Sequence, residues 1–249
     1  MRLIISFNLK HEKITNDYRG FLLSFLKFSL SKEYDDFFQK TYLDGPLAKP
    51  FSFSVYIKNL IHENGFIISP HKTITMIISS NDYELILLLY NSMLLNKNKY
   101  TPIKPNNSAK LIRISLKYLD EITENEIQIK MLSPLLVRLH EKESNVDEYL
   151  TIQDNKFEEK LNDNVKRMLK DFNIVDDSFL IEPIKANKVV VPIMRINYDA
   201  TLGTFLLKGK KETLNLLYKI GIGSRRNYGF GLFEIKWIKV YIFYQRESL

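Results

Sequence analysis

Residues 51–57 read Phe-Ser-Phe-Ser-Val-Tyr-Ile, and this alternation of apolar and polar side chains is typical of a half-buried strand. The turn sequence Glu63-Asn64-Gly65 follows, and two more strands are predicted at 66–69 and 72–79. The stretch 51–79 therefore predicts two or three consecutive strands.

Helices are predicted on both sides of this stretch. Before it, residues 2–9 form a strand, and Asn16 or Asp17 could cap a helix whose apolar residues recur at helical spacing. After it, Asp82 caps a helix through Leu95, and residues 111–116 alternate as a strand. The first half thus reads as strand, helix, two or three strands, helix, strand.

The second half of the chain repeats this order. Its predicted elements are a strand at 127–136, a helix at 157–172, paired strands at 189–197 and 204–207, a helix at 212–220 and a strand at 229–243. Two consecutive βαββαβ units mean an α+β protein with two tandem ferredoxin-like domains, which resemble RNA-recognition modules. We place the domains at 1–120 and 121–249, with the glycine-rich loop in the second.

Composition narrows the possible functions. The 249 residues include 45% apolar residues, with 16 Phe and 14 Tyr, so a folded core is expected. A formal charge of +7 favours an anionic partner such as a nucleic acid. The absence of cysteine excludes disulfides, thiol nucleophiles and cysteine-ligated metals. No stretch is long enough to span a bilayer, so a cytoplasmic protein without membrane contact is expected.

One segment is rich in chemically useful groups: Gly221-Ile-Gly-Ser-Arg-Arg-Asn-Tyr-Gly-Phe-Gly231, between a predicted helix and strand. In a dinucleotide-binding fingerprint the glycines follow a strand and open a helix, which is the reverse of the order here. The segment also lacks the Gly-Lys-Ser/Thr of a P-loop. Exposed amides and arginines could hold phosphates, and the aromatic rings could stack on a base or anchor the loop. The alternative is a glycine-rich turn with solvated arginines. The predicted RNA-binding residues are Gly221, Gly223, Ser224, Arg225, Arg226, Asn227, Tyr228, Gly229, Phe230 and Gly231.

This segment resembles the C-terminal glycine-rich signature of the CRISPR-associated Cas-six endoribonucleases, of the RAMP superfamily. Three further segments resemble that family in the same order along the chain. They are Asp17-Tyr-Arg19, Lys49-Pro-Phe-Ser-Phe-Ser54 and Met131-Leu-Ser-Pro-Leu-Leu-Val-Arg138. The resemblance implies a protein that binds CRISPR repeat RNA in the precursor transcript. Other CRISPR-associated proteins and a second copy of the chain are possible further partners.

The family resemblance also implies a reaction. A ribose 2′-OH attacks the adjacent phosphate without a metal or other cofactor, which leaves 2′,3′-cyclic phosphate and 5′-OH ends. Histidine usually assists the proton transfers, but here Asp44 stands in the turn where that histidine is expected. Lys49 would stabilise charge on the phosphorane. The predicted catalytic residues are Lys49, Asp44, Tyr42 and Lys27, and no metal ligand is expected.

Two alternatives remain open from the sequence. The missing histidine favours a repeat-RNA binding protein that does not cleave. Related folds also serve as structural subunits of CRISPR interference complexes. Outside the loop, Arg138, Lys185, Lys188 and Arg195 are further candidates for RNA contact, and His62 and His71 are candidates to reach the site from the strands that follow Lys49.

Overall fold

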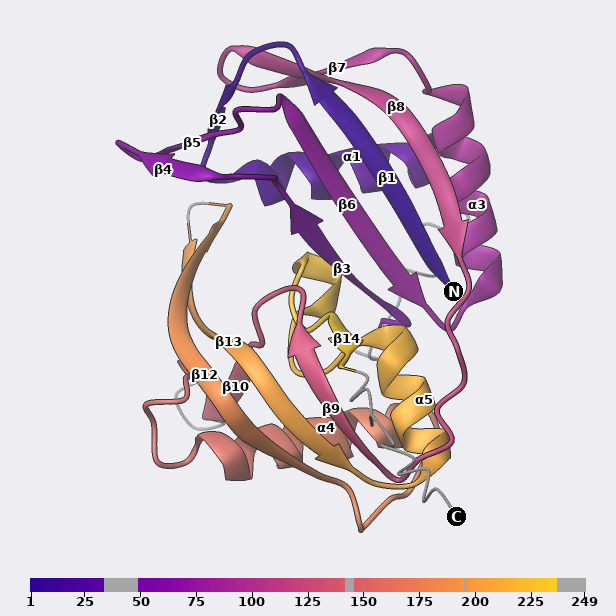
Figure 1. Cartoon of the computed structure of the whole chain (residues 1–249), viewed down its shortest axis with the longest axis vertical. Coiled ribbons are helices and arrows are strands. Elements are labelled where there is room, and N and C mark those ends of the chain that lie inside the picture. Colours follow the sequence, from indigo (N-terminus) through magenta and orange to yellow (C-terminus); the bar gives the residue numbers. More distant parts are fainter. Residues whose placement is uncertain (34–48, 142–145, 195, 237–249) are drawn as a thin grey trace, which may run out of the picture.

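The structure is a computed structural model that describes residues 1–33, 49–141, 146–194 and 196–236. Two antiparallel sheets lie one above the other, each with its own pair of helices (Figure 1). The fold is α+β with two tandem ferredoxin-like units, as the sequence predicts. Within the described residues, no helix is long and apolar enough to cross a membrane.

The first unit has the sheet order β3-β6-β1-β8-β7, in which β7 (Tyr100–Ile103) extends the edge of a βαββαβ core. A separate small sheet contains β2 (Lys13–Thr15), β4 (Ile61–Glu63) and β5 (Phe66–Ile68). The core elements are β1 (Arg2–Leu9), α1 (Tyr18–Glu33), β3 (Phe51–Tyr56), β6 (Thr73–Ser80), α3 (Tyr83–Leu95) and β8 (Asn107–Lys117).

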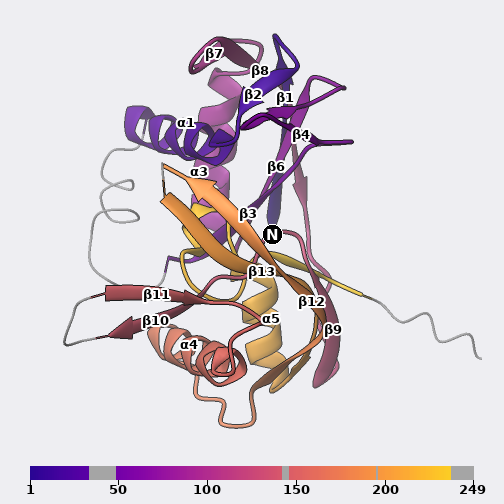
Figure 2. The same cartoon turned by 90° about the vertical axis from the view of Figure 1, so that its left-hand side faces the viewer.

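The second unit repeats the topology with the sheet order β12-β13-β9-β14. An extra hairpin of β10 (Val137–Glu141) and β11 (Val146–Leu150) projects beside it (Figure 2). The short 3-10 helix η2 (Arg226–Tyr228) lies in the glycine-rich loop. The core elements are β9 (Glu126–Met131), α4 (Phe157–Asp171), β12 (Leu180–Ile193), β13 (Ile196–Lys208), α5 (Lys211–Ile220) and β14 (Phe233–Ile235).

Both predicted helix caps of the first unit are present. Asp17 Oδ1 accepts a hydrogen bond from the amide of Gly20 at 3.1 Å, and Asp82 Oδ1 accepts one from Leu85 at 3.0 Å. These carboxylates satisfy amides that have no partner inside the first helical turn. Asp17 Oδ2 also accepts from the amide of Met194 at 2.9 Å. The first helix is thereby tied to the β12–β13 hairpin of the second unit.

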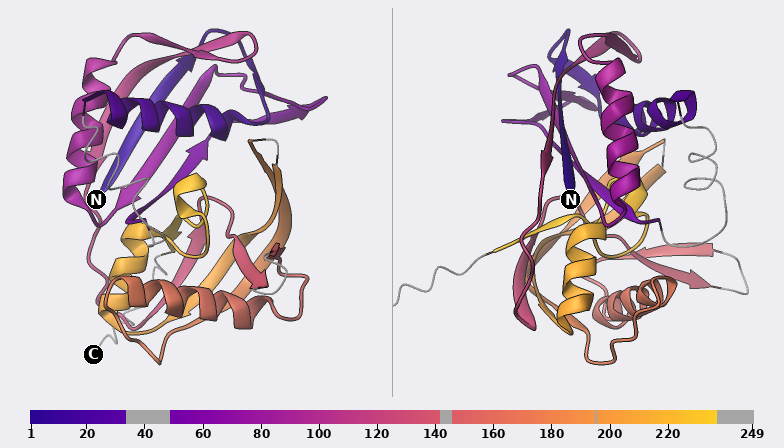
Figure 3. Two further views of the ribbon diagram at one scale, coloured as in Figure 1. Left: turned by 180° about the vertical axis from the view of Figure 1, so that it is seen from behind. Right: turned by 90° about the vertical axis from the view of Figure 1, so that its right-hand side faces the viewer.

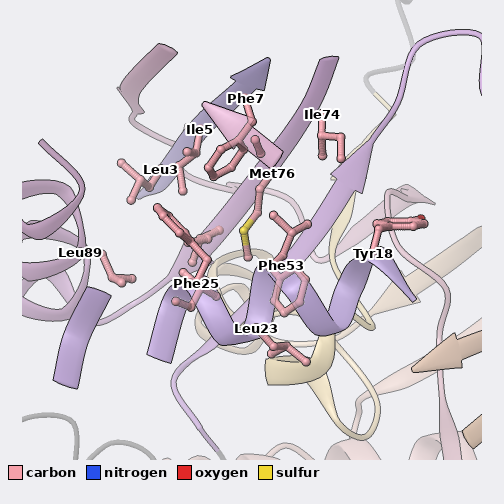
Figure 4. Close-up of a cluster of buried hydrophobic side chains, with 14 of the residues drawn as sticks. Leu3, Ile5, Phe7, Tyr18, Leu23, Phe25, Phe53, Ile74, Met76 and Leu89 are labelled. Carbon is pink, nitrogen blue, oxygen red and sulfur yellow. The ribbon is translucent and has the colours of Figure 1, made fainter. Parts of the chain in front are cut away.

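Aromatic and aliphatic side chains of β1, β3, β6 and the helices fill the first core (Figure 4). Phe7 and Phe25 meet edge to face, with ring centroids 5.2 Å apart. The same cluster includes residues of the second unit, namely Leu136, Val191, Ile193, Tyr198, Ala200 and Phe230. The units therefore share buried apolar surface, which favours one fixed arrangement between them.

The sheets divide the chain near the predicted boundary, since the first uses residues 2–117 and the second 126–235. Division into domains 1–120 and 121–249 stays a prediction. Seen from behind and from the other side, α1 and α3 cover one face of the first sheet, and α4 and α5 cover one face of the second (Figure 3).

Two strand predictions were wrong in their limits. The predicted strand 189–197 contains the turn between β12 and β13, where Met194 has a left-handed φ of 49°. The apolar run before this turn gives no glycine or asparagine signal. The predicted strand 229–243 begins only at Phe233 among the described residues, because Gly229–Leu232 belongs to the glycine-rich loop.

Candidate functional site

The glycine-rich loop, residues 221–231, connects α5 to β14 and packs against both units. Its backbone bonds to the segment after β9: the amide of Gly231 donates to Pro134 O at 2.9 Å, and that of Ser224 donates to Leu136 O at 2.8 Å. The loop also closes on itself, with Ile222 N donating to Gly231 O at 2.9 Å. Two of the segments that resemble the family are thus in direct contact.

Glycine is required at Gly229 and Gly231 for close approach. Both have positive φ, at 89° and 74°. A Cβ at Gly231 would overlap the carbonyl oxygen of Ile222, and one at Gly229 would lie 2.7 Å from the ring of Phe53 on β3. Any larger residue would therefore push the two ends of the loop apart at Gly231, or push the loop away from the first unit at Gly229.

Arg225 lies on the side of the loop that faces the β10–β11 hairpin. It has a left-handed φ of 49°, and its Nε donates to the hydroxyl of Tyr149 at 2.7 Å. Its guanidinium lies 5.5–5.9 Å from the ring centres of Tyr149, Tyr198 and Tyr228. The side chain remains 33% exposed, so the charge is reachable from solvent while three rings hold it in place.

Asp147 is the carboxylate of this group. Its Oδ1 accepts from Arg138 Nε at 2.6 Å and lies 2.9 Å from His140 Nδ1, while Oδ2 is 3.5 Å from Arg225 Nη2. Burial raises the pKa of Asp147, but hydrogen bonds from His140 and Arg138 outweigh burial and leave the pKa below its usual value. We call Arg138, His140, Asp147, Tyr149 and Arg225 the hairpin cluster.

The hydrogen bond between Arg225 and Tyr149 affects the pKa of both side chains. Burial alone lowers the pKa of Arg225, yet this bond and the nearby tyrosines and Asp147 raise it above the ordinary value. Burial raises the pKa of Tyr149. Arg225 is therefore a cation and Tyr149 a neutral phenol at physiological pH.

Arg226 points the other way, into the interface between the units. It is 5% exposed, and its Nη2 donates to the main-chain oxygen of Lys49 at 2.6 Å. Burial lowers the pKa of Arg226 to about 10, which attraction to Asp171 only partly offsets. Its Nε has no hydrogen-bond partner among the described residues.

The predicted catalytic residues are only partly described by the structure. Lys49 lies half-buried just before β3, and Lys27 lies half-buried on α1. Tyr42 and Asp44 lie outside the described residues, as does Arg195 among the further RNA candidates. The assignment of all four residues to catalysis stays a prediction.

The ten predicted RNA-binding residues divide into two groups. Gly223, Ser224, Arg225, Asn227 and Tyr228 are partly exposed, whereas Gly221, Arg226, Gly229, Phe230 and Gly231 are buried. Phe230 is 0% exposed and meets Tyr198 edge to face at 5.8 Å, so its ring anchors the loop. Contact of these ten residues with RNA stays a prediction.

His62, His71 and Lys188, which are candidates from outside the loop, are not part of the hairpin cluster. His62 on β4 and His71 before β6 are both exposed. The strand β4 projects from the first unit on the side away from α1 (Figure 2). Lys188 pairs with Asp199 at 2.7 Å. Among the described residues, no group of three or more potential ligands could hold a metal ion.

Sequence reasoning missed His140, Asp147, Tyr149 and Tyr198. The first three come from a hairpin that we did not predict, and Tyr198 lies beyond a turn that we placed inside a strand. Apolar and polar side chains alternate in Val137–Glu141 but not in Val146–Leu150, so only one strand of the hairpin carries a local signal, and that strand is too short to specify its partner.

The repeated topology and the packed glycine-rich loop define a tandem ferredoxin-like protein of the RAMP type. Residues 116–235 match the family model "CRISPR associated protein Cas6, C-terminal". Residues 116–235 of this chain therefore correspond to the C-terminal domain of the CRISPR-associated Cas6 family.

Solved structures share the fold over nearly the whole chain. An RAMP protein binding different RNA substrates is 19% identical and has a TM-score of 0.82, with 95% of this chain and 100% of that chain covered. A Cas6-related protein from Pyrococcus furiosus is 23% identical, with a TM-score of 0.80 and coverage of 95% and 98%. A Cas6 product complex is 13% identical, with a TM-score of 0.71 and coverage of 94% and 99%. No curated protein sequence matches this chain.

Proposed function

We propose that this protein binds CRISPR repeat RNA and cuts it without a metal ion, as a processing endoribonuclease for precursor CRISPR RNA. The observation that carries the proposal is the 2.6 Å bond from Arg226 to Lys49 O, which joins the glycine-rich loop to the lysine segment 177 residues earlier. These two segments resemble the family independently in sequence, and here they meet in space.

The proposed reaction requires few groups from the protein. The RNA supplies its own nucleophile, the ribose 2′-OH, so the protein must align it with the phosphate and stabilise the charge that develops. Lys49 would supply a positive charge at the phosphorane, and Lys27 a second one. Tyr42 and Asp44 are the candidates for proton transfer. The partly exposed Arg225 and Tyr228 of the loop would hold the RNA strand.

The test is to incubate purified protein with its own repeat RNA in EDTA and to analyse the ends of any fragments. Cleavage at one position that leaves a 2′,3′-cyclic phosphate, and that a single 2′-deoxy substitution at that position abolishes, supports the proposal. Lys49→Ala should lower the single-turnover rate at least about tenfold, because charge stabilisation of the phosphorane is lost. Cleavage that requires added metal would overturn the mechanism.

A second function is favoured by one observation, the absence of histidine from the turn before Lys49. In that case the protein binds repeat RNA tightly and leaves it intact. The EDTA experiment separates the two, since it tracks retained RNA as well as fragments. A structural role in a CRISPR interference complex, association with a second copy and a cytoplasmic location stay predictions.

A further inference from the structure

We infer that Arg226 is a positioning residue that fixes Lys49 from the opposite unit, rather than a ligand of the RNA. The inference rests on the proposed function, because it takes Lys49 as a group that acts on the RNA phosphate. The two consecutive arginines of the loop then have different roles. Arg225 is partly exposed and can contact RNA directly, whereas Arg226 acts on the RNA only through Lys49.

Arg226 occupies an unfavourable place for a cation. Its side chain is almost wholly buried, its Nε lacks a described partner, and burial shifts its pKa down to about 10. A methionine or leucine would fill the same space without the cost of removing a cation from water. What the guanidinium provides instead is a directed, charge-assisted hydrogen bond to Lys49 O.

The bond from Arg226 also completes a two-point fixation of the backbone. Lys49 O accepts from Arg226 Nη2, and Pro50 O accepts from Ser80 Oγ at 2.6 Å. Two consecutive carbonyls, those of Lys49 and Pro50, are therefore held by side chains from different elements. The proline fixes its own φ as well, which leaves the half-buried Lys49 side chain extending from a rigid main chain.

The loop that carries the Arg226 donor is itself held rigidly. The residues around Arg226 take left-handed φ values, 49° at Arg225 and 89° at Gly229, and the loop bonds to Pro134 O and Leu136 O. Gly229 lies against Phe53, two residues into the strand that Lys49 precedes. A rigidly held donor keeps Lys49 at a fixed position relative to the second unit. Misplacement of a catalytic group by about 1 Å can cost about a hundredfold in rate.

The experiment compares Arg226→Met, which keeps length and loses donors, with Arg226→Lys, which keeps the charge. Single-turnover cleavage of the repeat RNA is measured at saturating protein, and Kd by filter binding. We expect Arg226→Met to slow cleavage by about 10-fold to 100-fold with Kd within about twofold of wild type, and Arg226→Lys to recover part of the rate. Lys160→Met, which removes a cation paired with Glu159 and Asp163 on α4, is the matched control and should change neither quantity.

Weakened binding at an unchanged saturated rate would make Arg226 an RNA ligand and overturn the inference, as would no change in either quantity. If Arg226→Met does not fold, Arg226→Lys decides: a slower saturated rate at a native-like Tm supports positioning, and an unchanged rate refutes it.

A second measurement tests the role of Arg226 even if the protein does not cleave RNA. If wild-type protein does not cleave, amide hydrogen exchange of residues 51–54 is compared between wild type and Arg226→Met without RNA. Faster exchange confined to that segment supports a fixing role for Arg226. Unchanged exchange shows that Arg226 does not hold this segment, whatever the protein does to RNA.

Discussion

Arg225 and Arg226 are neighbours in sequence and opposites in environment. Arg225 is one-third exposed, surrounded by three tyrosine rings and balanced by Asp147. Arg226 is buried and bonded to a main-chain oxygen of the other unit. The glycine-rich loop therefore has a packed side, made by Arg226, Gly229, Phe230 and Gly231, and an open side, made by Arg225 and Tyr228. Changes on the packed side should act on stability and geometry, and those on the open side on RNA affinity.

The largest effect is expected from Gly231→Ala on the packed side. Its new Cβ would overlap Ile222 O while the residue keeps a φ of 74°, so we expect a loss of at least about 4 kcal/mol in unfolding free energy. Gly65→Ala is the control, because Gly65 has a φ of 76° but nothing within 4 Å of its added Cβ. It should cost only about 1–2 kcal/mol. Urea unfolding followed by circular dichroism measures both, and equal losses would remove the packing argument.

A smaller effect is expected on the open side from Arg225→Ala. Loss of one cation that contacts phosphate should weaken binding of repeat RNA by about tenfold and reduce the slope of log K against log salt by about 0.7. Fluorescence anisotropy between 50 and 300 mM salt gives both numbers. Tyr228→Leu is the companion variant, since it removes a ring but no charge and should leave the slope unchanged. A reduced affinity with an unchanged slope for Arg225→Ala would mean that Arg225 only orders the hairpin cluster.

The smallest effect concerns Asp147 and pH. Hydrogen bonds from His140 and Arg138 lower the pKa of Asp147 in the folded protein. Its contribution to stability is therefore complete above the unfolded pKa of about 3.9 and is lost as pH falls through the lower folded value. Asp147→Asn should cost about 1 kcal/mol at pH 6, and the difference from wild type should shrink below about pH 4. A difference that does not shrink at all on acidification below about pH 4 would point to packing rather than charge.

Several features of the fold could be read directly from the sequence. The alternation in 51–57 predicts β3, Asp82 predicts the start of α3, and the repeated order of strands and helices predicts two ferredoxin-like units. These signals are local, because side-chain alternation and helix capping depend on neighbours within a few residues. The same local signals failed at Met194, where an apolar run hid a turn, and at β10–β11, whose pairing joins two short segments.

The candidate site could be predicted only in part. The glycine-rich loop and Lys49 were recognisable as motifs. The sequence did not show which side chains of the loop face solvent. Phe230 and Tyr228 are both aromatic and two residues apart, yet Phe230 is fully buried and Tyr228 lies beside Arg225. The difference depends on tertiary packing: Phe230 lies within the first core, whereas Tyr228 packs only partly against that core and also lies beside Arg225 of the hairpin cluster.

The sequence by itself determined the order of elements, the helix caps and the glycine pattern that lets one loop pack tightly. Tertiary structure alone decided that Arg226 reaches Lys49 and that Arg225 joins Asp147 and Tyr149. The physical reason is distance along the chain. Backbone conformation is set by adjacent residues, whereas the partner of a long cationic side chain is set by surfaces that meet only when both units are folded.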